Sequence, residues 1–229
     1  MKTKIIFIYL LFLIIHFSAC GQENKLEEFA DFNKYAEANE KLGSPKPGEK
    51  RVVFMGNSIT EFWAGGFFSE NKYINRGISG QTTPQMLLRF RNDVINLKPD
   101  LVVILAGIND IAENTGPIAL EDIFGNIVSM TQLAEANGIK VILCSVLPAY
   151  DFPWNTGLNP LEKIIKLNEM IKLYCEQNNI PYVDYYSSMV DERKGLDKKY
   201  SEDGVHPNLS GYKVMEPIVK KAIKKLIKN

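Results

Sequence analysis

Five short runs of apolar and β-branched residues divide the chain and predict buried strands. Runs of this length with little polar interruption are typical of strands that are covered on both faces of a sheet. They occupy residues 51–55 (RVVFM), 72–76 (KYINR), 101–106 (LVVILA), 140–146 (KVILCSV) and 181–186 (PYVDYY).

Helical segments separate these runs, because their apolar residues recur every three or four positions. A threonine followed by a proline begins the first helix at Thr83, and further helices are predicted from about Leu120, from Asn159 and after Ser210. Pro217 must either kink the last helix or mark its true start. Strands that alternate with helices in this way predict a parallel sheet covered on both faces, which is an α/β fold.

The start of the chain follows a different pattern. Two lysines precede an apolar run over residues 5–17, which is shorter than the ~20 residues of a helix that spans a bilayer, and small residues then precede Cys20. This pattern predicts a secretory signal over residues 1–19. Residues 17–20 (FSAC) also resemble the lipobox of bacterial lipoproteins, so we predict an exported lipoprotein, anchored to the membrane at Cys20 and facing the periplasm or the cell surface. An uncleaved anchor and a plain secretory signal are the alternatives.

The rest of the chain is predicted to form one domain. Residues 20–50 contain a short polar tether and an amphipathic helix from Lys25 to Leu42, and residues 51–229 form the domain itself. A length of 229 residues with 45% hydrophobic content is enough for a full core. The 27 basic and 27 acidic residues are dispersed, so no nucleic-acid partner is expected. The sequence does not predict an oligomeric state.

Neither a disulfide nor a metal site is expected in this domain. Cys144 and Cys175 lie in apolar segments and are predicted to be buried thiols. Beyond the leader the chain has a single histidine, His206. It therefore lacks the nitrogen and sulfur ligands that a zinc site needs.

The unusual residues of the chain follow the predicted strands. GNSIT follows the first strand, GISGQT the second, GIND the third and DGVHP the fifth. Loops at the carboxyl ends of parallel strands meet at one edge of the sheet. Ser58 supplies a hydroxyl that needs a neighbouring base, and His206 is the one candidate imidazole in the domain. Asp203, three residues earlier, can orient that ring and stabilise its charged form.

Three groups at the same edge are candidates to stabilise an oxyanion. The backbone N–H of Gly80 has no side chain in its way, Asn109 carries an amide NH₂, and the N–H of Ser58 lies at a helix start. Taken singly, Ser58 could be a helix cap, and Gly80 and Asn109 could be turn residues. Together with Asp203 and His206 they complete one reaction scheme.

These four segments resemble those of the SGNH hydrolases, also called the GDSL esterase/lipase family. In that family a serine in Gly-Asp-Ser, a glycine, an asparagine in Gly-x-Asn-Asp and an Asp-x-x-His occur in this order. The matching residues are Ser58, Gly80, Asn109, Asp203 and His206. Asn57 departs from the aspartate of the family name, and we expect it to tune the turn without loss of activity. The resemblance implies a three-layer α/β/α sandwich on a flavodoxin-like, five-stranded parallel sheet, and ester hydrolysis through an acyl-enzyme without a cofactor.

The substrate is less well defined by the sequence. Trp63, Ile108 and Trp154 lie beside the predicted site and are candidates to bind it. No long apolar insertion could form a lid, which favours small acyl groups. Family members of this kind remove acetyl groups from polysaccharides, so the predicted substrate is a small ester or an acetylated glycan. Lysophospholipase or thioesterase activity is the alternative within the family.

Two other classes of protein are alternatives to an esterase. A glycan-binding module with a decayed site is disfavoured, because no member of the residue set is missing. A nucleotide or flavin binder is disfavoured, because no glycine-rich phosphate-binding motif follows any strand.

Overall fold

The computed structural model describes residues 25–227. The predicted signal over residues 1–19 and the predicted lipidation of Cys20 lie outside the described residues and stay predictions. Within residues 25–227, none of the helices combines the length and the apolar character that crossing a membrane requires.

Five parallel strands form one sheet in the order β2-β1-β3-β4-β5. They are β1 (Val52–Gly56), β2 (Ile74–Gly77), β3 (Leu101–Ile104), β4 (Lys140–Cys144) and β5 (Tyr182–Val183). Each strand overlaps one of the five runs named above, so the predicted parallel sheet is confirmed. The chain adds β2 on one side of β1 and β3 on the other, so the direction of strand addition reverses between β1 and β3. Ligands of open α/β sheets bind beside such a point.

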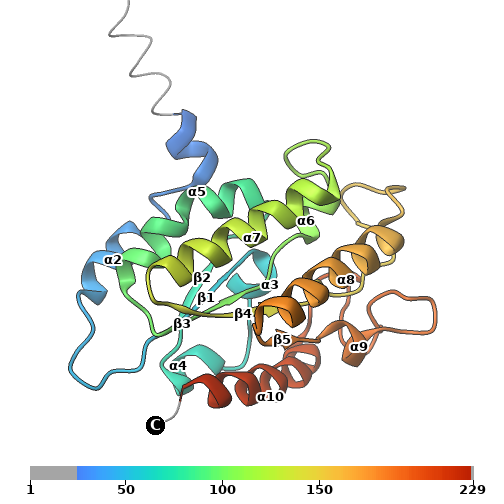
Figure 1. Cartoon of the computed structure of the whole chain (residues 1–229). Coiled ribbons are helices and arrows are strands. Elements are labelled where there is room, and N and C mark those ends of the chain that lie inside the picture. The colour runs from blue at the N-terminus through green and yellow to red at the C-terminus, as the bar shows by residue number, and fades with distance from the viewer. Residues whose placement is uncertain (1–24, 228–229) are drawn as a thin grey trace, which may run out of the picture.

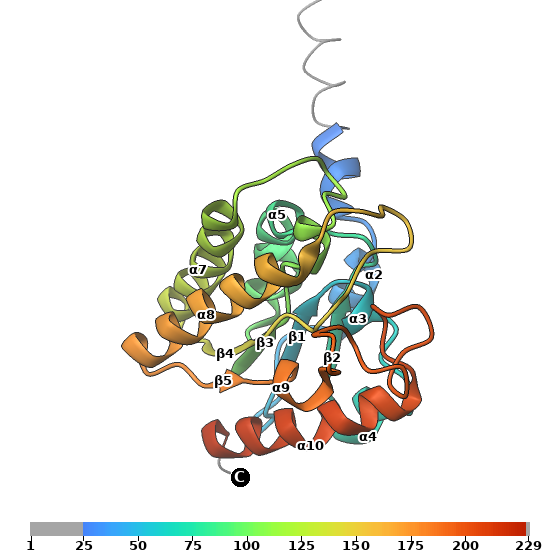
Figure 2. The same ribbon diagram turned by 90° about the vertical axis from the view of Figure 1, so that its right-hand side faces the viewer.

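Helices cover both faces of the sheet (Figures 1 and 2). Helices α5, α7 and α8 pack side by side on one face, and α10 with the short α4 and α9 covers the other. The helices are α2 (Ala36–Leu42), α3 (Ser58–Glu61), α4 (Phe67–Asn71), α5 (Thr83–Asp93), α6 (Ile108–Ile111), α7 (Leu120–Ala136), α8 (Pro160–Asn178), α9 (Tyr186–Met189) and α10 (Leu209–Leu226), with a 3₁₀ helix over Ile95–Leu97. The fold is thus the three-layer α/β/α sandwich that the family resemblance implies.

The predicted helix from Lys25 to Leu42 is not continuous. Residues 25–30 are helical, residues 31–35 form turns, and α2 follows. Asp31 has a φ of 52°, which is a left-handed conformation that no α-helix accommodates. The prediction of one helix is therefore wrong, because apolar spacing alone does not show where the backbone turns.

Two further predictions need adjustment at element ends. The strand predicted over residues 181–186 is shorter, because the N–H groups of Tyr185 and Tyr186 both donate to Ser145 Oγ at 2.9 Å and the chain turns into α9. The last helix begins at Leu209, where the Asn208 side chain accepts from Gly211 N–H at 3.1 Å. Pro217 therefore lies inside α10 and does not mark its start.

The core lies between the sheet and its two helical layers. Strands β1 and β3 are buried along their whole length, as expected for strands covered on both faces. Cys144 and Cys175 are buried and are not joined by a disulfide, as predicted. The loops that leave β1, β2 and β3 and the loop that precedes α10 meet at one edge of the sheet (Figure 2).

Candidate active site

The hydroxyl of Ser58 lies where β1 turns into α3. Ser58 is the first residue of α3, and the side chain of Asn57 caps the helix by accepting from Ile59 N–H at 3.1 Å. A neutral amide oxygen can make this bond, which explains why Asn57 can stand where the family name has aspartate. Ser58 is 3% exposed, and its Oγ lies 2.9 Å from Nε2 of His206. The structure thus brings together a hydroxyl and an imidazole that are 148 residues apart in the chain.

Asp203 orients the imidazole of His206. Oδ2 of Asp203 lies 2.6 Å from Nδ1 of His206, and Oδ1 accepts from the N–H groups of Val205 and His206 at 2.9 and 2.8 Å and from Ser201 Oγ at 3.1 Å. Because an ionised carboxylate only accepts hydrogen bonds, Nδ1 carries the proton, and Nε2 is left to accept from Ser58. This is the arrangement a general base requires.

The charge of Asp203 is stabilised by the groups around it. Partial burial opposes ionisation, but the hydrogen bonds from the His206 side chain and from the backbone of His206 and Val205 outweigh it and lower the pKa of Asp203 to about 2. Asp203 therefore stays ionised across the pH range in which esters are assayed.

Two predicted oxyanion donors lie at the same edge of the sheet as Ser58. Gly80 belongs to the loop of residues 78–82, here called the oxyanion loop, and Asn109 belongs to α6. Gly80 has a φ of 77°, a conformation that favours glycine, and among residues 25–227 no backbone carbonyl accepts its N–H. Asn109 on α6 is 2% exposed, and its Nδ2 donates to the Gln81 carbonyl at 3.0 Å. An amide nitrogen carries two N–H groups, so one remains available for a ligand.

Asp110 ties α6 to the start of α5, a contact that the sequence did not suggest. Its carboxylate accepts from Thr83 N–H at 2.9 and 3.0 Å and from Thr83 Oγ1 at 2.6 Å. Asp110 is 1% exposed. Burial raises its pKa to about 6, although the bonds from Thr83 act in the opposite direction.

Replacing Asp110 by asparagine is expected to change how stability depends on pH. A folded-state pKa above the unfolded value means that the folded protein binds the proton more tightly, so the stability that this group contributes falls as pH rises from about 4 to about 6. Ionisation of Asp110 is expected to cost about 3 kcal/mol by pH 7. In Asp110→Asn the side-chain amide oxygen can still accept from Thr83. The free energy of unfolding of this variant should lack the decrease with rising pH that ionisation of Asp110 causes. Urea unfolding from pH 4 to pH 7.5, with Asp122→Asn on the exposed face of α7 as control, measures it; equal slopes in all three proteins would contradict it.

Two exposed aromatic side chains flank His206. The ring of Trp154 lies 5.8 Å from that of His206 and is 45% exposed, and the ring of Phe62 lies 6.4 Å away and is 56% exposed. Trp154 Nε1 donates to Asn114 Oδ1 at 2.9 Å, and Asn114 Nδ2 donates to the Gly80 carbonyl at 3.0 Å. Trp154 was predicted at this position; Phe62 and Asn114 were missed, although Phe62 belongs to the aromatic-rich segment EFWAGGFF.

The other two candidate substrate-binding residues do not line the surface of the site. Trp63 is 7% exposed and stacks between Phe67 and Tyr212, with ring centroids 4.9 and 5.1 Å away. Ile108 is 3% exposed and belongs to the same core. Both were assigned from their nearness in sequence to Ser58 and Asn109, but their side chains point into the protein. Both are therefore core residues and do not form the substrate-binding surface.

A cavity of about 330 Å³ borders the Asp203 side of the site. Its lining includes Tyr150, Arg193 and Asp203, but neither Ser58 nor His206. The reacting centre is therefore located by the hydrogen bonds of Ser58, His206 and Asp203 and not by this cavity. Within residues 25–227, no group of three or more His, Cys, Asp or Glu side chains is arranged to hold a metal ion.

Comparison with known proteins shows which family and which structures this chain resembles. A model of the GDSL-like Lipase/Acylhydrolase family matches residues 54–214. The crystal structure of a GDSL-like lipase from Bacteroides thetaiotaomicron is 54% identical and superposes with a TM-score of 0.85 over 87% of this chain and 100% of that chain. Platelet-activating factor acetylhydrolase IB subunit alpha2 of Homo sapiens is 29% identical over 185 residues, 76% of each chain. An acetylxylan esterase of Xylanibacter ruminicola is 25% identical over 222 residues, which cover 80% of this chain and 45% of that protein.

Proposed function

Because the chain belongs to the GDSL-like lipase/acylhydrolase family and is a carboxylic ester hydrolase, we propose that it removes acetyl groups from carbohydrate through an acyl-enzyme on Ser58. One observation carries the proposal: the exposed indole of Trp154 lies beside the imidazole of His206. In this mechanism His206 must protonate the leaving alcohol. The distances among Ser58, His206 and Asp203 support the choice of Ser58 as nucleophile, His206 as base and Asp203 as the carboxylate that orients the base.

The proposed reaction begins with proton transfer from Ser58 Oγ to His206 Nε2 as Oγ attacks the acetyl carbonyl carbon. The carbonyl oxygen becomes an oxyanion, which the amide of Asn109 and the N–H groups of Gly80 and Ser58 stabilise. The C–O bond to the alcohol then breaks, and His206 gives its proton to the leaving oxygen. A water molecule attacks the acetyl-enzyme by the same steps, which releases acetate and restores the Ser58 hydroxyl.

The leaving alcohol defines the class of substrate. Since His206 Nε2 must reach the leaving oxygen, the rest of the alcohol lies near the side chains that flank the imidazole. Trp154 and Phe62 are exposed aromatic side chains there, and a planar aromatic ring can stack on the C–H face of a sugar ring. The names of two relatives, an acetylhydrolase and an acetylxylan esterase, favour acetate as the acyl group.

Substitution of Trp154 tests the carbohydrate part of the proposal. Trp154→Ala is expected to raise KM for an acetylated xylooligosaccharide about fivefold, because loss of one stacking contact costs about 1 kcal/mol, and to leave KM for p-nitrophenyl acetate within about twofold. Trp154→Phe, which keeps a ring, should restore most of the glycan KM. Leu173→Ala, which truncates an exposed apolar residue on α8, is the control and should change neither value.

Two further outcomes would replace the proposal. A p-nitrophenyl ester series in which kcat/KM rises from acetate to palmitate would indicate a lysophospholipase or thioesterase. Binding of acetylated glycan without any hydrolysis would indicate a glycan-binding module. The lipid anchor at Cys20 remains a prediction from the sequence, and it would place this activity at a membrane surface.

A further inference from the structure

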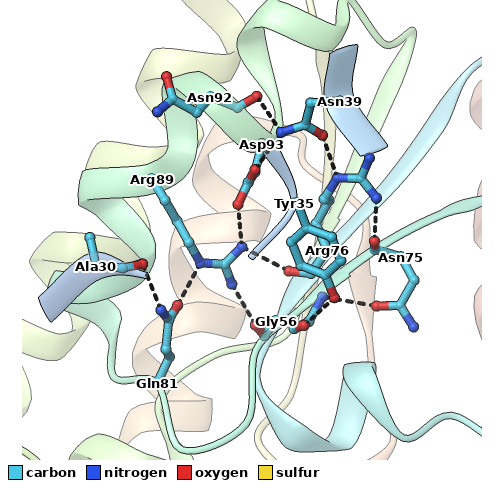
Figure 3. Close-up of polar contacts among 11 residues, drawn as sticks. Ala30, Tyr35, Asn39, Gly56, Asn75, Arg76, Gln81, Arg89, Asn92 and Asp93 are labelled. Atoms are coloured by element: carbon cyan, nitrogen blue, oxygen red, sulfur yellow. Dashed lines mark hydrogen bonds and ion pairs between the residues drawn. The ribbon is translucent and has the colours of Figure 1, made fainter. Parts of the chain in front are cut away.

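A buried polar cluster lies behind the oxyanion loop, and the proposed reaction does not use it (Figure 3). At its centre is Arg89 on α5, which is 0% exposed. Arg89 donates to the side chains of Gln81 and Asp93 and to the backbone carbonyls of Gly56 and Arg76, at distances from 2.5 to 3.0 Å. A guanidinium offers five N–H donors in a fixed plane, so a buried arginine can hold several segments in one relative position.

Arg89 joins the ends of the two strands that lead into the site. Gly56 ends β1 two residues before Ser58, and its carbonyl accepts from Nη2 of Arg89 at 2.9 Å. The carbonyl of Arg76 in β2 accepts from Nη1 at 3.0 Å. There is little free space at this junction, because a Cβ at Gly56 would lie 2.0 Å from Oγ1 of Thr60.

Gln81 connects this cluster to the oxyanion hole. Its side chain is held at both ends, since Oε1 accepts from Nε of Arg89 and Nε2 donates to the Ala30 carbonyl at 2.8 Å (Figure 3). Its backbone carbonyl accepts from Nδ2 of Asn109 at 3.0 Å. Because the amide group is planar, a bond to one of its N–H groups fixes the direction of the other. The position of the Gln81 carbonyl therefore sets where the free N–H of Asn109 points.

The segment before the domain completes the support. Ala30 is 0% exposed and supplies the acceptor for Gln81. Tyr35 OH donates to the Gly77 carbonyl at the end of β2, and Asn39 bridges Arg76 and Asp93 at 2.8 and 2.7 Å. The oxyanion loop is thus held from behind by residues that lie outside the predicted domain.

We propose that Gln81 is a positioning residue that, held by Arg89 and Ala30, aims the Asn109 amide at the oxyanion; this inference rests on the function proposed above. Gln81 touches no reacting atom, so its effect on the reaction passes through Asn109. Loss of the two side-chain bonds lets the carbonyl of Gln81 shift, and the second N–H of Asn109 shifts with it. A displaced N–H donor stabilises the oxyanion of the transition state less well, whereas binding of the uncharged ester in the ground state changes little.

A double-mutant cycle separates this role from a structural one. Gln81→Met removes both side-chain bonds at nearly constant volume and is expected to lower kcat for p-nitrophenyl acetate about tenfold with KM changed less than twofold. In an Asn109→Ala background the same substitution should change kcat less than twofold, because its target is gone. Gln81→Glu keeps an acceptor for Arg89 and should lose less activity than Gln81→Met. Gln132→Met on the exposed face of α7 is the control and should match the wild type.

Each outcome has one meaning. An equal tenfold loss in both backgrounds, or a rise in KM with kcat unchanged, would overturn the positioning role of Gln81. Thermal unfolding shows whether each variant is folded. If Gln81→Met does not fold, the double-mutant cycle is measured with Gln81→Glu in its place. Absence of hydrolysis in the wild type would instead refute the proposed function, so the two failures are distinguishable.

Discussion

Replacing Ser58 by alanine is expected to lower kcat for p-nitrophenyl acetate by about 10⁴-fold or more, since the members of such a triad act as one unit. The Ser58 hydroxyl is the one nucleophile within hydrogen-bonding distance of Nε2 of His206 among the described residues. Without it the oxyanion donors can still bind an ester, but no acyl-enzyme can form. A residual rate above water is expected from those donors alone.

The matched control for this experiment is Ser129→Ala, a serine on the outer helix α7 that should keep full activity. Mass spectrometry after treatment with a phosphonate ester gives an independent readout. The wild type should carry one covalent adduct on the peptide that contains Ser58, and Ser58→Ala should carry none there. Equal hydrolysis rates in the wild type and in Ser58→Ala would end the proposed mechanism.

Asp203→Asn is the substitution with the second-largest expected effect, a loss of about 10⁴-fold in kcat. Oδ1 of Asp203 accepts from two backbone N–H groups and from Ser201 Oγ, so an asparagine must place its oxygen there and turn its NH₂ toward His206. Nδ1 of His206 then has to accept, and the ring proton moves to Nε2. An imidazole in this tautomer cannot take the proton of Ser58.

The geometry of the loop should survive this change, which makes it a test of protonation and not of folding. The thermal midpoint of Asp203→Asn is expected to lie within a few degrees of the wild type, because the backbone hydrogen bonds are kept. Asp184→Asn is the control, since Asp184 also accepts a backbone N–H, from Ser187 at 2.9 Å. Retention of more than about a tenth of the activity in Asp203→Asn would show that the carboxylate does not set the tautomer.

The parts of this protein that the sequence predicts are those with a local physical signal. Uninterrupted apolar runs predict the strands because burial on both faces leaves no position for polar residues. The motif residues could be assembled at one edge because parallel strands all end there. The break at Asp31 carries no such signal, since the turn depends on contacts that Tyr35 and Ala30 make with distant residues.

Apart from Phe62, the residues of the site that the sequence did not indicate are polar groups whose partners lie far along the chain. Arg89 sits on a helix that the apolar pattern predicts, yet its burial depends on carbonyls of β1 and β2 that no periodicity marks. Asp110 stands in the motif GIND next to Asn109, but its bond to Thr83 spans 27 residues and leaves no local signal. Trp63 is the reverse case, a residue that the sequence placed in the site and the structure places in the core. Nearness to Ser58 in sequence does not determine which way a side chain points.

The last helix holds the nucleophile in place as well as closing the fold. The hydroxyl of Tyr212 on α10 donates to the carbonyl of Ile59, next to Ser58, at 2.9 Å, and His206 lies three residues before the first residue of that helix, Leu209. A growing polypeptide therefore has no working site until α10 has been made and has docked. Synthesis proceeds at about 5 to 20 residues per second, so the nascent protein spends many seconds as an inert chain. The chain cannot hydrolyse an ester until its folding is complete.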